Sequence, residues 1–213
     1  MIVAIMRHQT AVVRFASGRV RRLTFRAVRK RQTHERILRS AGRIARREGL
    51  RAASVPRVMR GAGLTVGGFY AHFRSKRAMD TELVRTMLGE LPGRWLRGLD
   101  NATGLEWVGK AVKRYLSTAH RDNDDGCAYP AVLSEIAKAP LEVHRAFVEA
   151  FELRAAAFAV HMPELPGTSV RERVLATMAL TVGGLLLARA TNGDPVSEEM
   201  LMACRKWALP DIA

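Results

Sequence analysis

Apolar residues recur every three or four positions along most of the chain, which is the spacing of amphipathic α-helices. The first such stretch begins at Thr33 and ends at Gly49, a residue type common at helix C-termini. Capping residues and Gly, Pro and Asn breakers bound the others. No run alternates apolar and polar residues for long enough to build a sheet, so the predicted fold class is all-α. We expect helices over residues 33–48, 54–61, 66–73, 75–91, 106–119, 130–137, 141–161, 169–191 and 197–208.

The composition is that of a globular protein. The chain has 213 residues, of which 48% are apolar and 26% are charged, so it can bury a core without disulfides. Two cysteines are too few for a disulfide framework, which favours a reducing, cytoplasmic compartment. The longest uncharged apolar stretch, residues 174–188, is shorter than a membrane span. The apolar run at residues 2–6 is too short for a signal peptide, so we expect no membrane association.

Positive charge is concentrated at the N-terminal end. Residues 1–31 contain nine Lys or Arg and no Asp or Glu, and residues 32–80 add a net charge of +8. Residues 81–213 carry −2, within a formal total of +15. A polyanion is therefore the expected partner of the first 80 residues, and the remainder is expected to have a different role.

The basic segment over residues 1–31 has no clean period. Its apolar residues, such as Val12, Val13 and Val20, are compatible with a short strand or helix. One interpretation is a disordered extension, or residues from a start codon placed too early. The other is an arm that follows the DNA backbone or enters a minor groove. We treat it as a separate segment ahead of a predicted domain at residues 32–77.

Two short predicted helices with a glycine-containing turn between them form a helix-turn-helix pattern over residues 54–73. Ser54 and Thr65 are good N-caps, and Gly61 and Gly63 end the first helix. The stretch Ser-Val-Pro-Arg-Val-Met-Arg-Gly-Ala-Gly-Leu-Thr-Val-Gly-Gly-Phe-Tyr-Ala-His-Phe, followed by Ser75-Lys76, strongly resembles the DNA-binding domain of TetR-family repressors. This resemblance is specific over about residues 32–90.

The resemblance implies specific DNA contacts in this chain. The residues expected to contact phosphates are Ser54, Thr65, Tyr70, His72 and Lys76, with Arg57 adding charge nearby. Val66 and Gly67 occupy the positions that read base edges, and Gly68 helps to keep the front of that helix thin. Many family members carry a polar residue at the position of Gly67, so direct base readout is expected to be thin here. Phe69 and Phe73 are expected to be core residues.

The resemblance assigns residues 78–213 to a ligand-binding and dimerisation domain. Residues 176–188 are apolar nearly all round, so that helix must be buried on more than one side. The pair Gly183-Gly184 would allow a neighbouring helix to approach closely. A core helix of a monomer remains an alternative, but two recognition helices on a palindromic operator require a homodimer.

The small-molecule effector is unknown from the sequence. Apolar and aromatic residues that could line its pocket are Met87, Trp95, Trp107, Tyr115, Cys127, Tyr129 and Phe147. Cys127 also follows Gly126, as in a Gly-Cys group of TetR-like sensors of electrophiles. Its acidic neighbours Asp124 and Asp125 argue against a reactive thiolate, so inert packing is the favoured interpretation.

Other classes of protein are disfavoured. The segment 104–111 approaches a P-loop, but it has Ala111 where a Mg²⁺-binding Ser or Thr is needed. The six histidines show no metal-ligand spacing, and no catalytic residue, metal or cofactor is expected. A non-specific basic DNA binder remains the second alternative. The resulting expectation is a repressor released from double-stranded operator DNA by a small-molecule inducer.

Overall fold

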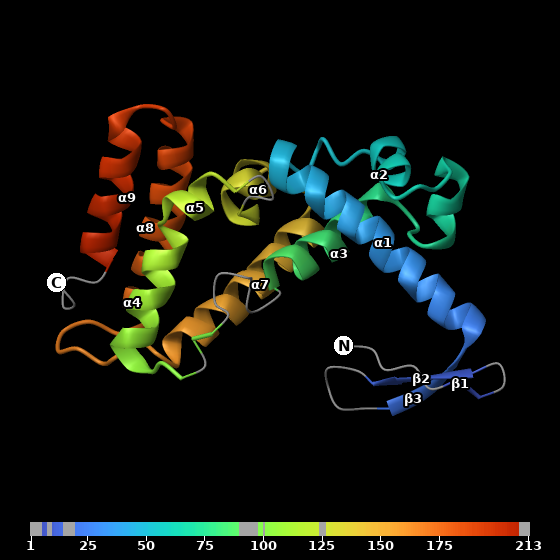
Figure 1. Cartoon of the computed structure of the whole chain (residues 1–213), viewed down its shortest axis with the longest axis horizontal. Helices are drawn as coiled ribbons and strands as arrows, with labels where there is room; N and C mark the ends of the chain where they lie inside the picture. Colours follow the sequence, from blue (N-terminus) through green and yellow to red (C-terminus); the bar gives the residue numbers. More distant parts are fainter. Residues whose placement is uncertain are drawn as a thin grey trace.

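The computed structural model describes residues 6–7, 10–14, 20–89, 98–99, 101–123 and 127–208. The chain is elongated, with the helices that precede residue 90 at one end and α8 (Val170–Ala190) with α9 (Pro195–Ala208) at the other (Figure 1). Helix α7 (Leu141–Ala159) runs between the two ends. The all-α prediction is confirmed for the described residues from 25 onward.

A small antiparallel sheet precedes the helices, in contrast to the prediction that no sheet forms. Its strands are β1 (Met6–Arg7), β2 (Thr10–Arg14) and β3 (Val20–Thr24), in that order. Opposite residues pair from Thr10 with Thr24 to Arg14 with Val20. The β-branched residues of β2 and β3 favour extended backbone. Five residues per strand were too few to establish an alternating pattern among so many arginines.

The first helix, α1 (Phe25–Glu48), begins earlier than the predicted start at Thr33. Thr24 caps it, because its side chain accepts a hydrogen bond from the Ala27 amide at 3.3 Å. Between Thr24 and Thr33 the sequence has no Gly or Pro, so nothing interrupts the helix. The helix therefore crosses the boundary expected between residues 31 and 32 and joins the basic segment directly to the domain predicted to bind DNA.

Three elements follow α1: α2 (Val55–Gly61), η1 (Val66–Ala71) and α3 (Lys76–Gly89). The predicted helix at residues 66–73 is a 3₁₀-helix that ends at Ala71, because two adjacent glycines weaken α-helical propensity in a short segment. Gly63 has φ +64°, which suits the tight turn before η1. The Ser40 hydroxyl donates to the Val58 carbonyl at 2.9 Å and fixes α1 on α2.

The C-terminal helices form a second packed region. The predicted helix at 106–119 is divided into α4 (Gly104–Tyr115) and α5 (Thr118–Arg121). The division occurs because Leu116 leaves helical geometry and the Ser117 side chain caps the next turn. The Ser169 side chain and Glu172 form a reciprocal capping box at the start of α8. The helix not yet delimited is α6 (Ala128–Ile136).

Helix α8 has one buried face and one exposed face. With 21 residues, this helix is long and apolar enough to cross a membrane, judged by length and composition alone. The uncharged stretch at residues 174–188 within it is shorter than a membrane span. Core helices meet the same criteria. Gly184 lies against α9, where a Cβ atom would stand 2.5 Å from Cys204 Sγ, so the predicted close approach of a neighbouring helix is confirmed at this glycine.

Candidate nucleic-acid interface and ligand cavity

The outward face of η1 consists of Val66, Gly67 and Tyr70. The side chains of Val66 and Tyr70 are 47% and 69% exposed, whereas Phe69 is fully buried. Phe73 is buried as well, and its ring stacks on that of Phe69 with centroids 5.4 Å apart. The two phenylalanines are therefore core residues, as predicted, and they hold η1 so that its small, open face points to solvent.

Ser54 and Thr65 stand at the N-caps of α2 and η1, as predicted. Neither side chain makes a capping hydrogen bond with the helix that follows it. Two hydroxyls at helix N-termini, where backbone N–H groups also point outward, suit an anion such as a DNA phosphate.

Lys76, which was predicted to contact phosphate, and Arg57, which was predicted to add charge nearby, are both engaged within the protein. Arg57 donates through Nη1 and Nη2 to the Glu48 carboxylate at 2.8 and 2.6 Å, and this bond lowers the Glu48 pKa. Lys76 donates to both oxygens of Asp80 at 2.6 and 2.7 Å. Burial raises the Asp80 pKa, and Lys76 opposes that shift. Contact with DNA would require both cations to be shared between a carboxylate and a phosphate.

His72 faces α1 rather than open solvent. Its ring centroid lies 6.0 Å from that of His34, whose Nε2 is 2.6 Å from Glu82 Oε1. The His72 Nδ1 atom is buried without a hydrogen-bond partner. Burial, and then the nearby charges of His34 and Lys30, lower the His72 pKa. A neutral imidazole can donate one N–H to a phosphate but adds no charge to the interface.

The basic surface extends from η1 along α1. Arg43 on α1 donates to the Gly61 carbonyl at 3.4 Å, which places its guanidinium beside the end of α2. Salt-sensitive attraction to the DNA backbone needs this kind of clustered positive charge. Exposed arginines of α1 and α2 are Arg26, Arg29, Arg31, Arg36, Arg39, Arg43, Arg47, Arg57 and Arg60.

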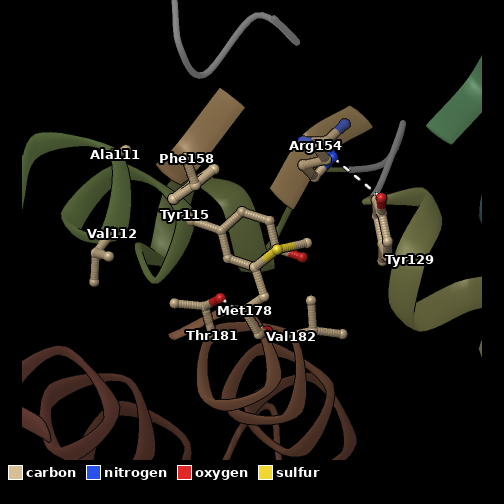
Figure 2. Close-up of a pocket in the computed structure, with 9 residues that line it drawn as sticks. All are labelled: Ala111, Val112, Tyr115, Tyr129, Arg154, Phe158, Met178, Thr181 and Val182. Carbon is tan, nitrogen blue, oxygen red and sulfur yellow. Dashed lines mark hydrogen bonds between the residues drawn. The ribbon is translucent and has the colours of Figure 1, made fainter. Parts of the chain in front are cut away.

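A cavity of about 20 Å³ lies between α4, α6, α7 and α8 (Figure 2). This volume is sufficient for about one water molecule, so a larger ligand must open it. Its lining is mostly apolar, with Arg154 and Tyr129 on one side and Tyr115 projecting between α7 and α8. The lining residues are Ala111, Val112, Tyr115, Tyr129, Arg154, Phe158, Met178, Thr181 and Val182.

Arg154 is the charged residue of this lining and was not among the sequence candidates. Its Nε donates to the Tyr129 hydroxyl at 3.2 Å, and its Nη2 donates to the Leu88 carbonyl at 3.1 Å. Arg154 follows Ala146 and Ala150 at four-residue spacing on the buried stripe of α7. The sequence signal that could have identified Arg154 is a charged residue at a core position of a helical period.

The structure brings Tyr115 and Tyr129 into the cavity, while Met87, Trp107 and Phe147 lie elsewhere. Met87 and Phe147 pack at the edge of the buried cluster that α1, α2, η1 and α3 share with α6 and α7. Trp107 stacks on His161, with ring centroids 4.1 Å apart. Trp95 lies outside the described residues.

Cys127 contacts the cavity lining through Tyr115, whose hydroxyl is 3.0 Å from Cys127 Sγ. Burial is the largest influence on this thiol and raises its pKa, despite smaller opposing effects from Tyr115 and two arginines. Burial likewise raises the Tyr115 pKa well above its ordinary value. The environment therefore favours a neutral thiol, in agreement with the packing interpretation.

We expect native Cys127 to react with iodoacetamide at pH 7–8 several-fold more slowly than in urea, because only the thiolate reacts. A raised folded-state pKa means that the thiol contributes stability below its unfolded pKa and loses that contribution as pH rises through its folded pKa. Mass spectrometry of tryptic peptides measures the labelling rate, with buried Cys204 as an internal reference. Equal native and unfolded rates at Cys127 would contradict the expectation.

Residues 37–83 match the family described as "Bacterial regulatory proteins, tetR family". Among solved structures, the reduced form of NemR from E. coli is similar with a TM-score of 0.71 and 16% identity, over 84% of this chain and 97% of that one. A TetR-family transcriptional regulator from Agrobacterium tumefaciens gives a TM-score of 0.64 and 20% identity, over 84% and 98% of the two chains. No curated protein matches the sequence.

FadR from Bacillus subtilis in complex with stearoyl-CoA is also similar, with a TM-score of 0.61 and 13% identity. It covers 84% of this chain and 100% of that one. At these identities the structures establish the shared fold. The fold and the match over the helix-turn-helix together define a DNA-binding transcriptional regulator. Residues 37–83 carry the N-terminal domain of this family, and the solved structures share the fold of the chain.

Proposed function

We propose that this protein is a homodimeric repressor that binds a palindromic operator and leaves it when a small molecule enters the cavity between α4, α6, α7 and α8. The observation that carries the proposal is the polar connection from this cavity to the DNA-binding helices. Ligand binding needs to favour one of two conformers by only a few kcal/mol to change operator occupancy.

The first connection runs through α3 and α7, which are parallel. Arg77 on α3 lies 3.6 Å from Glu142 at the start of α7, and Arg85 donates to Glu149 at 2.9 Å further along. Arg154 reaches Leu88 near the end of α3. Because these contacts follow one another along both helices, a shift of α7 at the cavity is transmitted to α3.

The second connection runs through α6. Tyr129 lines the cavity near the start of this helix, and Glu135 lies near its end. The Glu135 carboxylate accepts a hydrogen bond from the Arg51 amide at 2.7 Å, in the turn between α1 and α2. A Cβ atom on Gly49, which has φ +89°, would collide with the same carboxylate. Movement of α6 would therefore displace the turn that precedes α2.

The exposed face of α8 supports the homodimer. The residues on this face recur every three or four positions and are small or apolar, so the face resembles the seam of a helical bundle. Gly183 on the same face has no neighbouring atom near its Cβ position within the protomer. The exposed apolar residues of α8 and α9 include Ala176, Ala179, Leu186, Leu187, Ala190, Val196, Met202, Ala203 and Trp207.

Fluorescence anisotropy on tiled duplexes from the DNA that flanks the gene tests this function. At physiological salt, we expect one tile to be retained while a scrambled duplex of the same composition is not. Equal and salt-sensitive binding to every duplex would instead support a non-specific basic DNA binder and contradict the proposal. The retained tile then serves as the operator in every later assay.

Tyr70→Phe should weaken binding to operator and scrambled duplexes alike by about fivefold, because one phosphate hydrogen bond of about 1 kcal/mol is lost. Val66→Ala is the matched variant on the same face of η1, and it should alter preference at one base pair. Anisotropy titrations with single-base operator variants measure both effects. A base-specific change with Tyr70→Phe would show that Tyr70 does not act through phosphate.

A further inference from the structure

We propose that the effector is an apolar molecule with a carboxylate, and that the carboxylate binds Arg154 and takes its guanidinium away from the end of α3. This inference rests on the proposed function, because it specifies the ligand of the same cavity. It depends on three features: the chemistry of the lining, the geometry of Arg154 and the position of Leu88.

The lining selects the chemical class of the ligand. Phe158, Met178 and Val182 supply apolar surface, and no Asp or Glu is found among the described residues that line the cavity. Thr181 donates its hydroxyl to backbone carbonyls of its own helix, Thr177 at 2.8 Å and Met178 at 3.1 Å. A cationic ligand would be repelled by the Arg154 charge, and the described part of the lining offers such a ligand no carboxylate. An apolar body with one negative group matches both parts of the lining.

Arg154 has the geometry to bind such a group. A guanidinium presents parallel N–H groups that match the two oxygens of a carboxylate. In this structure Arg154 Nε donates to the Tyr129 hydroxyl, and Arg154 Nη2 donates to the Leu88 carbonyl. Both are neutral oxygens and weaker acceptors than a carboxylate, so an incoming carboxylate can displace them.

The displaced carbonyl belongs to the last turn of α3. Carbonyls at a helix C-terminus lack intrahelical partners, and a cation there stabilises the helix through its dipole. Arg154 therefore acts as a cap for α3, whose other end begins at Lys76 beside η1. When the carboxylate neutralises Arg154 and draws it away from Leu88, the tie between α3 and α7 is weakened.

The cavity must enlarge for this to happen. A volume of about 20 Å³ is too small for an organic acid, so the walls must move apart when the acid binds. Met178 is the flexible wall residue, and Gly183 and Gly184 follow it by about one and a half turns on the same helix. Opening the cavity would separate α7 from α8 on the side where Arg154 contacts α3.

Isothermal titration calorimetry of the full-length protein with decanoate, 1-decanol and decylamine tests the ligand class. We expect decanoate to bind at least tenfold more tightly than decanol, with no binding of decylamine. In Arg154→Gln this preference should disappear. Arg154→Lys keeps the charge but loses the paired donors, so it should retain only part of the preference. Circular dichroism melting establishes that each variant is folded.

Equal binding of decanoate and decanol would overturn the inference, as would a full preference for decanoate in folded Arg154→Gln. If Arg154→Gln does not fold, Arg154→Lys decides the outcome, since undiminished preference in that variant excludes paired recognition. Anisotropy with the operator duplex gives the second readout: decanoate should release wild-type protein, and decanol should not. If a sequence-specific operator is found but decanoate does not release the protein from it, this inference alone is refuted. If no operator is found, the proposed function is refuted.

Discussion

Replacing Leu187 by glutamate should convert the proposed dimer to a monomer and lower operator affinity by about a hundredfold or more. The side chain is 51% exposed in the protomer, so the substitution leaves the protomer core intact. In the proposed interface each protomer would bury one glutamate, and unpaired charges in a desolvated interface are strongly unfavourable. A monomer binds one half-site and loses the effective-concentration advantage of linked half-sites, which is typically a factor of about 10²–10⁴.

Sedimentation velocity measures the oligomeric state, and anisotropy with the operator measures the affinity. Val160→Glu is the control, because Val160 is also an exposed apolar residue but follows α7. The control protein should remain dimeric with unchanged affinity. A Leu187→Glu protein that sediments as a dimer would show that this face of α8 is not the interface.

Gly184→Ala should destabilise the protein by about 1–3 kcal/mol, as expected for overpacking in a core. The added Cβ would lie 2.5 Å from Cys204 Sγ, 3.0 Å from Cys204 Cβ and 3.4 Å from Leu116 Cδ2. Because Cys204 Cβ is attached to the α9 backbone, the whole helix must move to accommodate the methyl group. The chain offers its own control one residue earlier, since a Cβ on Gly183 would meet no atom within 4 Å.

Gly183→Ala should instead raise stability by about 0.5–1 kcal/mol, because alanine loses less backbone entropy than glycine in a helix. Urea unfolding followed by circular dichroism measures both variants. Repeating it over a range of protein concentrations separates protomer stability from association. Equal effects of the two substitutions would contradict the close packing of α8 on α9.

The sequence predicted the helical elements well because their signals are local. Gly49 and Gly63 both have positive φ at the chain reversals where they were expected. The predicted start of α1 at Thr33 was wrong, because Thr24 and Thr33 are equally good caps and only tertiary context distinguishes them. The strands were missed because their residues carry many charges and their pairing is not local.

In the candidate sites as well, features set by local spacing were predicted, and features set by contacts between helices were not. Exposure of Val66 and Tyr70 beside buried Phe69 follows from helical spacing within one short segment. Arg154 was missed because its function depends on Tyr129 and Leu88, which come from two other helices. The pairing of Lys76 with Asp80 was accessible in principle, since these residues stand four apart on one helix.

The buried residues beneath the recognition helix come from both parts of the chain. Ile37, Met59 and Phe69 share one apolar cluster with Val132 of α6 and Ala146 of α7. A fragment that ends before α6 would expose much of this cluster to water. The helix-turn-helix is therefore not an independent folding unit that can be excised or exchanged as a module. It is part of a cooperative unit with α6 and α7, and its amides should exchange with solvent deuterium together with theirs.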